Sequence, residues 1–283
     1  MPRIFFRFLF VATLGAVAFA VETKTSPPKR QTNTTSETVA GRAATPQEIA
    51  LLNEVLHKTA DDYWRWAYTE QKVIRDDKGK VKSETLLRFD PSKPYAEQWT
   101  PLKIEGREPT ERERTKYRRR GEKSGSEFGL SGKAAGDARQ RKSLGELIEV
   151  GKSLILSETT THLVFEVPLL KVGNERFPPE KFLVVARVKK EDRLLENVSV
   201  RLRESFRAKL IVKIKSGEGS LDFAPVNPKY PAALVAIQGD AVASVLFVNI
   251  GGSIELKRTE LKHVKPFDER FDVQIGTLKA IDF

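Results

Sequence analysis

The chain of 283 residues is long enough for one large domain or two small ones, and its composition, 31% charged and 40% hydrophobic, is that of a globular protein. It contains no cysteine, which excludes a disulfide framework, a thiol nucleophile and a cysteine-ligated metal site. The formal net charge is +11, so anionic partners have to be considered.

The first twenty residues have the pattern of a secretory signal peptide. Arg3 and Arg7 give a basic start, residues 8–20 form an apolar run, and the run ends in a small-x-small sequence at residues 18–20. The run is too short for a membrane span, which needs about 20 apolar residues. We therefore expect an exported protein that resides in the periplasm of a Gram-negative bacterium or is otherwise secreted.

A linker and a helix are predicted next. Residues 21–44 are rich in Thr, Ser, Pro, Lys and Arg, and we expect them to form a flexible linker. Thr45, Pro46 and Glu48 have the pattern of an N-cap, a proline at the first helical position and the glutamate of a capping box. Apolar residues follow at helical spacing to about residue 60, which predicts an amphipathic helix.

Residues 64–104 have the pattern of three strands. Trp64, Trp66 and Tyr68 fall on one face of an extended segment, and a turn is predicted over residues 76–79. A second strand is predicted over about residues 82–89, and a third, over residues 97–104, contains Trp99.

The next segment is strongly basic. Residues 110–113 form another capping box, and the helix that they start carries seven basic and two acidic residues between positions 112 and 123. A segment of this kind attracts anionic lipid headgroups at about 1 kcal/mol per basic residue, with a solvated charged loop as the alternative. We expect a charged mobile insert at about residues 105–142, followed by a short helix over residues 143–150. The residues expected to contact an anionic surface are Arg112, Lys116, Arg118, Arg119, Arg120 and Lys123.

From residue 159 onward the pattern is that of strands. Val198, Val200 and Leu202 alternate with polar residues, which predicts an antiparallel sheet with one solvated face. Turns are predicted at Gly173-Asn174, Gly217-Glu218-Gly219, Gly239-Asp240 and Gly251-Gly252. The predicted strands are 161–167, 181–189, 194–204, 208–216, 221–225, 232–238, 242–249, 253–264 and 271–283. This order predicts a single α+β domain over residues 45–283, with a twisted antiparallel sheet and two or three helices.

Motifs of catalysis are absent from the sequence. Residues 151–153 resemble the end of a phosphate-binding loop, but Glu146 stands where the first glycine belongs. Neither a G-x-S-x-G nor an H-E-x-x-H sequence is present. We therefore expect no enzyme activity, no cofactor and no bound metal.

The histidines and a late acidic cluster are interpreted as structural. His57, His162 and His263 are far apart in the sequence, so nothing indicates that they converge. Acidic residues between positions 268 and 272 lie among basic ones and are interpreted as a solvated turn rather than a metal site.

The order of these motifs resembles a family of secreted bacterial proteins. The residues that carry the resemblance are Trp64 and Trp66, the sequence R-F-D-P-S-x-P at Arg88–Pro94 and the sequence E-G-R-E-P-T at Glu105–Thr110. These proteins are similar to the periplasmic outer-membrane lipoprotein carriers (LolA-like proteins). The resemblance implies a strongly curved antiparallel sheet, an open and unclosed β-barrel, that is covered by two or three helices and binds acyl chains on its concave face. It assigns no single functional residue.

The expected function is non-catalytic binding of a lipid-like or acylated ligand, a lipid or an acylated protein, in an apolar concavity. The predicted lining residues are Trp64, Trp66, Tyr68 and Trp99, with simple core packing as the alternative for each ring. An anionic membrane surface is the second expected partner, nucleic acid is not expected for an exported protein, and a monomer is expected. Two other functions stay open: an envelope protein-interaction module whose barrel is filled, and a hydrolase.

Overall fold

The structure is a computed structural model that describes residues 41–129, 148–170, 178–209, 212–245, 248–267 and 269. It contains two α-helices, α2 (Pro46–Asp62) and α3 (Glu111–Gly129), and short 3-10 helices that include η2 (Tyr63–Arg65), η3 (Tyr95–Glu97) and η5 (Val150–Lys152). The first strands are β1 (Arg42–Ala43), β2 (Trp66–Asp76), β3 (Val81–Phe89), β4 (Trp99–Ile104), β5 (Leu154–Glu158) and β6 (His162–Glu166). The remaining strands are β7 (Phe182–Lys189), β8 (Leu194–Leu202), β9 (Phe206–Lys209), β10 (Val212–Ala224), β11 (Ala233–Val245) and β12 (Val248–His263).

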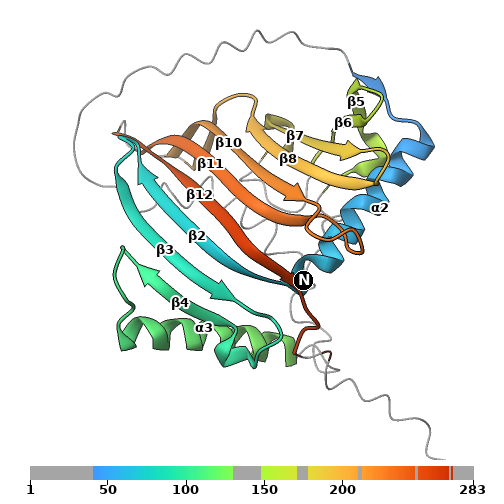
Figure 1. Ribbon diagram of the computed structural model, residues 1–283. Coiled ribbons are helices and arrows are strands. Elements are labelled where there is room, and N and C mark those ends of the chain that lie inside the picture. The colour runs from blue at the N-terminus through green and yellow to red at the C-terminus, as the bar shows by residue number, and fades with distance from the viewer. Residues whose placement is uncertain are drawn as a thin grey trace, which may run out of the picture.

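The twelve strands of the described residues belong to one antiparallel sheet (Figure 1). The strand order is β1-β5-β6-β7-β8-β10-β11-β12-β2-β3-β4, and β9 pairs with β10 beside this path. The sheet is unclosed, because β1 lies at one edge and β4 at the other. The last described strand, β12, pairs with β2 and so joins the hairpin of β2 and β3 to the rest of the sheet.

Helix α2 begins as its sequence predicts. The Thr45 side chain accepts a hydrogen bond from the backbone N–H of Glu48, and the Glu48 carboxylate accepts one from the backbone N–H of Thr45, which completes the capping box. The helix buries Leu52, Val55 and Leu56 in the main hydrophobic core. Their partners come from seven strands, β5 to β8 and β10 to β12, and include Phe165, Val184, Leu195, Leu221, Ile237 and Leu256. The apolar stripe of α2 therefore packs against one face of the sheet.

Three predicted turns are wrong, because the glycines lie inside long strands. Gly217-Glu218-Gly219 is in the middle of β10, Gly239-Asp240 is in β11 and Gly251-Gly252 is in β12. Gly219 pairs with Gly239, which in turn pairs with Ile254, so these glycines belong to the hydrogen-bonded ladder. Most of the predicted strand 208–216 consequently merges with 221–225 in β10, and 232–238 merges with the first part of 242–249 in β11. Residues 248–249 of the predicted strand 242–249 belong to β12.

Regular secondary structure is present in the described parts of the predicted insert and linker. Helix α3 continues to Gly129, within the insert predicted at about residues 105–142. Residues 42–43, which the sequence assigns to the linker, form β1 and pair with β5, a strand that the sequence analysis missed. In place of the last part of the predicted third helix, Ile148 bridges to Leu169 and η5 follows. The predicted signal peptide, the rest of the linker, residues 130–147 and the predicted strand over 271–283 lie outside the described residues.

The fold is thus broadly α+β, as predicted: a mostly antiparallel, unclosed sheet with two α-helices. The helices lie toward opposite edges of the sheet, α2 against the part that includes β8 and α3 beside the edge strand β4 (Figure 1). The space beside each helix and the free faces of the sheet are therefore where a binding site has to be sought.

Candidate functional site

The basic helix α3 has a firmly fixed start. The Glu113 carboxylate accepts hydrogen bonds from the backbone N–H of Thr110 at 2.8 Å and from two guanidinium nitrogens of Arg107 at 2.8 and 2.9 Å. These contacts, with that of Arg107 first, lower the pKa of Glu113 to about 2. The capping box predicted at residues 110–113 is confirmed.

The middle of α3 packs closely on η3 and β4. A Cβ atom on Gly121 would lie 1.8 Å from the carbonyl oxygen of Tyr95, so only glycine allows this approach. One residue earlier, the Arg120 guanidinium carbon lies 4.1 Å from the centre of the Trp99 ring. Trp99 in turn packs against Phe89, with 4.4 Å between the ring centres. The helix is therefore held against the edge strand through backbone contact and through an aromatic ring.

A pocket of about 360 Å³ lies at this edge, and we call it the edge pocket. Its basic lining consists of Arg88, Lys93, Arg114 and Arg118, and its acidic lining of Asp90 and Glu97. The other lining residues are Ala96, Gln98, Trp99, Thr100 and Pro101. Four cationic and two acidic side chains give the pocket a positive balance.

The cations of the edge pocket contributed by α3 are weakly engaged. The Arg114 Nε donates to the carbonyl oxygen of Pro109 at 3.2 Å, and Arg118 approaches Glu111 only to 3.9 Å. The ammonium group of Lys93 has no hydrogen-bond or ion-pair partner among the described residues. Arg114 and Arg118 are one helical turn apart and share a face, so the edge pocket can offer two guanidinium groups to one anion.

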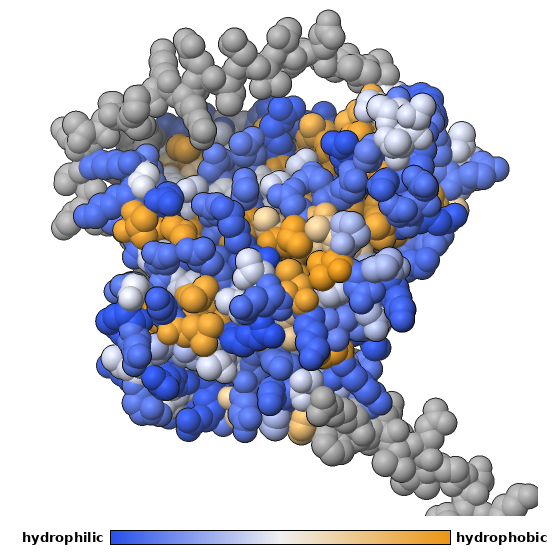
Figure 2. All heavy atoms as spheres, viewed as in Figure 1, coloured by the Kyte–Doolittle hydropathy of each residue, from blue (hydrophilic) through white to orange (hydrophobic). Residues whose placement is uncertain are grey.

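The six residues predicted to contact an anionic surface all lie on α3, and the surface in this region is mostly hydrophilic (Figure 2). They have different surroundings. Arg118 lines the edge pocket, Arg120 lies over Trp99, and Lys116 acts electrostatically on Lys72 of β2. Arg112, Arg119 and Lys123 are exposed. Surface contact by these residues stays a prediction.

The four predicted aromatic lining residues gather in one cluster. Trp66 and Tyr68 are buried with Phe89, and Trp64 and Trp99 pack against them. The prediction of one extended segment is wrong for Trp64, which lies in η2, because the chain becomes extended only at Trp66. Trp99 lines the edge pocket, whereas Trp66 and Tyr68 are 3% and 2% exposed within the core. Their role as a ligand-binding lining stays a prediction.

A buried ion pair lies on the face of the sheet that carries this cluster. The Arg258 Nε is 3.1 Å from a Glu70 carboxylate oxygen, and an Arg258 Nη donates to the Tyr63 hydroxyl at 2.9 Å. The Arg258 guanidinium also lies 3.9 Å from the centre of the Tyr68 ring. Burial lowers the pKa of the neighbouring Lys72, and the positive charges of Arg120 and Lys116 lower it further. This part of the interior thus combines a buried, charge-balanced ion pair with a partly buried lysine.

The histidines do not converge. His57 is exposed on α2, and His162 lies 3.0 Å from Glu196. The His263 Nε2 lies 2.8 Å from a carboxylate oxygen of Asp62, which also accepts a hydrogen bond from the Trp66 indole. The His263 ring stacks on Tyr230 with 3.5 Å between centres, so its surroundings are those of a packed interior residue. Of the acidic cluster predicted to be a turn, Glu269 pairs with Arg65 at 2.7 Å, and the other acidic residues lie outside the described ranges.

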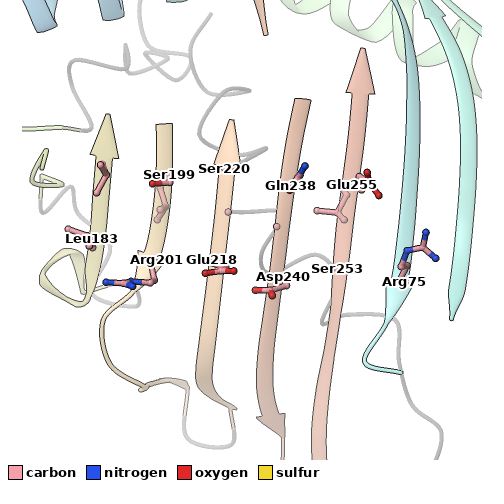
Figure 3. Close-up of a pocket in the computed structure, with 15 residues that line it drawn as sticks. Arg75, Leu183, Ser199, Arg201, Glu218, Ser220, Gln238, Asp240, Ser253 and Glu255 are labelled. Carbon is pink, nitrogen blue, oxygen red and sulfur yellow. The ribbon is translucent and has the colours of Figure 1, made fainter. Parts of the chain in front are cut away.

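A larger groove of about 760 Å³, which we call the sheet groove, crosses six strands from β7 to β2 (Figure 3). Two cross-strand rows of side chains line it. The first row is Leu183, Arg201, Glu218, Asp240, Ser253 and Arg75. The second row is Val185, Ser199, Ser220, Gln238 and Glu255. The sequence analysis missed the sheet groove because it placed Glu218 and Asp240 in turns.

Comparison with protein-family models, with curated proteins and with solved structures finds no match. The resemblance to lipoprotein carriers therefore stays a prediction. Within the described ranges, no helix has both the length and the apolar character that crossing a membrane requires. No group of three or more His, Cys, Asp or Glu side chains in those ranges is arranged as a metal site.

Proposed function

We propose that the protein is an exported, non-catalytic envelope protein that binds an anionic, lipid-like ligand, and that the edge pocket receives the charged end of this ligand. The observation that carries the proposal is the pair Arg114 and Arg118 beside Trp99 in one pocket. Guanidinium groups bind phosphate and carboxylate oxygens in a bidentate manner, and an indole ring offers an apolar surface beside them. A ligand with an anionic head and an apolar stem matches both.

The rest of α3 suits an approach to a membrane surface. Its exposed basic residues extend the positive charge of the edge pocket along the helix, which favours encounter with anionic lipid. The expected strongly curved open barrel would place the apolar part of the ligand on the concave side of the sheet. This part of the proposal rests on the resemblance to the lipoprotein carriers.

Vesicle binding tests the proposal. We expect the wild-type protein to sediment with vesicles that contain phosphatidylglycerol and not with pure phosphatidylcholine vesicles. The double variant Arg114→Gln/Arg118→Gln should bind the anionic vesicles about thirtyfold more weakly, because each basic residue near the surface contributes about 1 kcal/mol. Added salt should reduce the difference, since exposed charges are screened.

A matched control separates the edge pocket from net charge. Arg207→Gln/Lys213→Gln removes two exposed charges from the paired strands β9 and β10 and should change binding less than twofold. An equal loss in both double variants would contradict the proposal, because net charge would then explain the binding. Failure of the wild-type protein to bind would do the same.

A protein-interaction module with a filled interior is the second candidate function. It is favoured by the packing of α2 on the sheet and by the buried Arg258–Glu70 pair, which occupy the same face of the sheet. A pull-down from an envelope extract that retains one partner, while lipid extraction of the purified protein yields nothing, would favour this candidate.

A further inference from the structure

The sheet groove lies on the opposite face of the sheet from α2. Leu221 and Ile237 belong to the core that packs on α2, and side chains alternate between the two faces of a strand. Ser220 and Gln238, which are their chain neighbours, therefore point to the other face, where they line the groove. The sheet groove is thus independent of the edge pocket and of the function proposed above.

Four of the five charged side chains of the groove have no hydrogen-bond or ion-pair partner among the described residues, and the fifth, Glu255, pairs with Lys257 at 2.9 Å. Glu218 and Asp240 face each other across β10 and β11 and lie side by side (Figure 3). Neither their side chains nor those of Arg75 and Arg201 make a hydrogen bond or an ion pair with any described residue. Like charges directly opposite each other weaken a sheet, so the fold gains nothing from the acidic pair.

The second row of the groove and the end formed by β7 differ in chemistry from the charged first row. In the second row, Ser199, Ser220 and Gln238 are neutral and can both donate and accept hydrogen bonds, and Glu255 ends the row paired with Lys257. Leu183 and Val185 of β7 add apolar surface at one end. The groove therefore combines a site for a cation, two sites for carboxylates, hydrogen-bonding groups for amides and a place for an aliphatic side chain.

From this combination we infer that the sheet groove binds a short peptide with free ends, its α-amino group on Glu218 and Asp240 and its α-carboxylate on Arg75. A neutral sugar would leave both arginines unused, and none of the fifteen lining residues is an aromatic on which a sugar ring could stack. An acyl chain would bury the charged row without compensation. A peptide satisfies the charged first row and the neutral residues of the second row together.

The spacing sets the length of the peptide. Asp240 and Arg75 are separated by β12, which makes two strand-to-strand steps of about 4.8 Å each, or about 10 Å. An extended chain advances about 3.3–3.6 Å per residue, so three residues cover this distance. Arg201, one step beyond Glu218, is placed to bind an acidic side chain on the first residue of the peptide.

Calorimetric titration with trialanine tests the inference. We expect measurable binding to the wild-type protein, at least tenfold weaker binding of N-acetylated trialanine, and at least tenfold weaker binding of trialanine amide. Glu218→Gln/Asp240→Asn should abolish the preference for the free amino group. Arg75→Gln should bind trialanine and its amide equally, an outcome that a general loss of stability cannot produce.

The controls are Glu191→Gln and Arg207→Gln, two exposed positions outside the groove, which should bind trialanine as the wild-type protein does. The Arg114→Gln/Arg118→Gln variant should also bind it normally, so failure of the edge pocket and failure of the sheet groove are distinguishable. The inference is overturned if trialanine does not bind at millimolar concentration, if both blocked peptides bind as well as the free one, or if a neutral trisaccharide binds instead.

Discussion

Arg258 and Glu70 form an ion pair whose side chains are only 3% and 7% exposed. Two charges at such a depth lose their hydration, and the pair is tolerated because each charge neutralises the other and because Tyr63 and Tyr68 add contacts to the guanidinium. Removing one partner therefore lowers the stability far more than the intact pair contributes to it, because the other charge is left buried and uncompensated.

Replacing Arg258 by Met should therefore lower the free energy of unfolding by about 3–5 kcal/mol, because Glu70 is left buried without a counter-charge. Urea unfolding followed by circular dichroism measures the change. Arg193→Met removes an ion pair with Glu54 that is half exposed, and it should cost less than about 1 kcal/mol. Equal costs for the two variants would show that Arg258 is not buried as described.

Glu48 links the cap of α2 to β1. It accepts two hydrogen bonds from Arg42, at 2.6 and 2.9 Å, and these contacts with those from Thr45 lower its pKa to about 2. A folded-state pKa below the unfolded value of about 4.3 gives stability that is fully present above that value and is lost as the pH falls toward 2.

Glu48→Gln should accordingly lower the free energy of unfolding at pH 7 by about 1 kcal/mol, because the amide can keep its place in the capping box but loses the charge-assisted hydrogen bonds from Arg42. The gap between variant and wild type should narrow between about pH 4.5 and pH 2, as Glu48 of the wild type takes up its proton. Urea titrations at pH 7 and pH 2.5 measure both values. The variant Glu191→Gln, at an exposed position, should have the same free energy of unfolding as the wild type at either pH. If the difference between Glu48→Gln and the wild type became larger in acid, the lowered pKa of Glu48 would be refuted.

At the scale of elements, helix α3 depends on a residue with low helix propensity. Gly121 is buried against Tyr95, and its missing Cβ is what allows the helix to approach η3. In an exposed helix a change from Gly to Ala would add about 1 kcal/mol of stability. Here the added atom would overlap a backbone oxygen, so the helix has to move.

For Gly121→Ala we predict a loss of stability instead of a gain, together with weaker binding to phosphatidylglycerol vesicles, because Arg114 and Arg118 move with the helix. Urea unfolding and vesicle sedimentation give the two readings. Gly151→Ala is the control, since nothing lies within 4 Å of its added Cβ atom. A more stable Gly121→Ala protein would mean that α3 is not held against Tyr95.

The elements that the sequence predicts best are those with local signals. The cap at Thr45, the cap at Thr110 and the turn at residues 76–79 are all set by residues close in the chain, and all three are found. From the local sequence, the glycines inside β10, β11 and β12 are interpreted as turns. Whether a glycine ends a strand or continues it depends on the strand that pairs with it, which the local sequence does not reveal. The sheet groove could not be predicted from local sequence for the same reason, since its two rows consist of residues from six different strands. The edge pocket is predicted only in part. The sequence indicates Trp99, Arg118 and the positive charge of α3, but it does not indicate that they lie close together.

At the scale of the whole molecule, one sheet connects three separate clusters of buried apolar side chains among the described residues. The main core includes α2, and the aromatic cluster around Trp66 lies near β3 and β4. All three tryptophans of the chain lie between residues 64 and 99, so their fluorescence reports on one end of the sheet, whereas circular dichroism reports on all of it. If the sheet is a single cooperative unit, both signals have to change together.

Leu52→Ala in α2 should lower the free energy of unfolding by about 2–5 kcal/mol, because the side chain is fully buried. We expect the same shift in the tryptophan and circular dichroism transitions, although Leu52 belongs to a different cluster from the tryptophans. The surface variant Leu102→Ala, at a residue that is 40% exposed, should leave both transitions within about 0.5 kcal/mol of wild type. A shift in one signal alone would show that the sheet consists of two independent units.

The pairing of β12 with β2 also determines when the protein can finish folding. Strand β2 appears early in synthesis, but its partner on one side is the last described strand of the chain. Until that strand emerges, the hairpin of β2 and β3 has an open edge, and an open edge can pair with other chains. Such distant pairings give a high contact order and slow folding. A chain that stops before residue 248 would therefore keep this edge open and aggregate, whereas the complete chain would cover it in its last folding step.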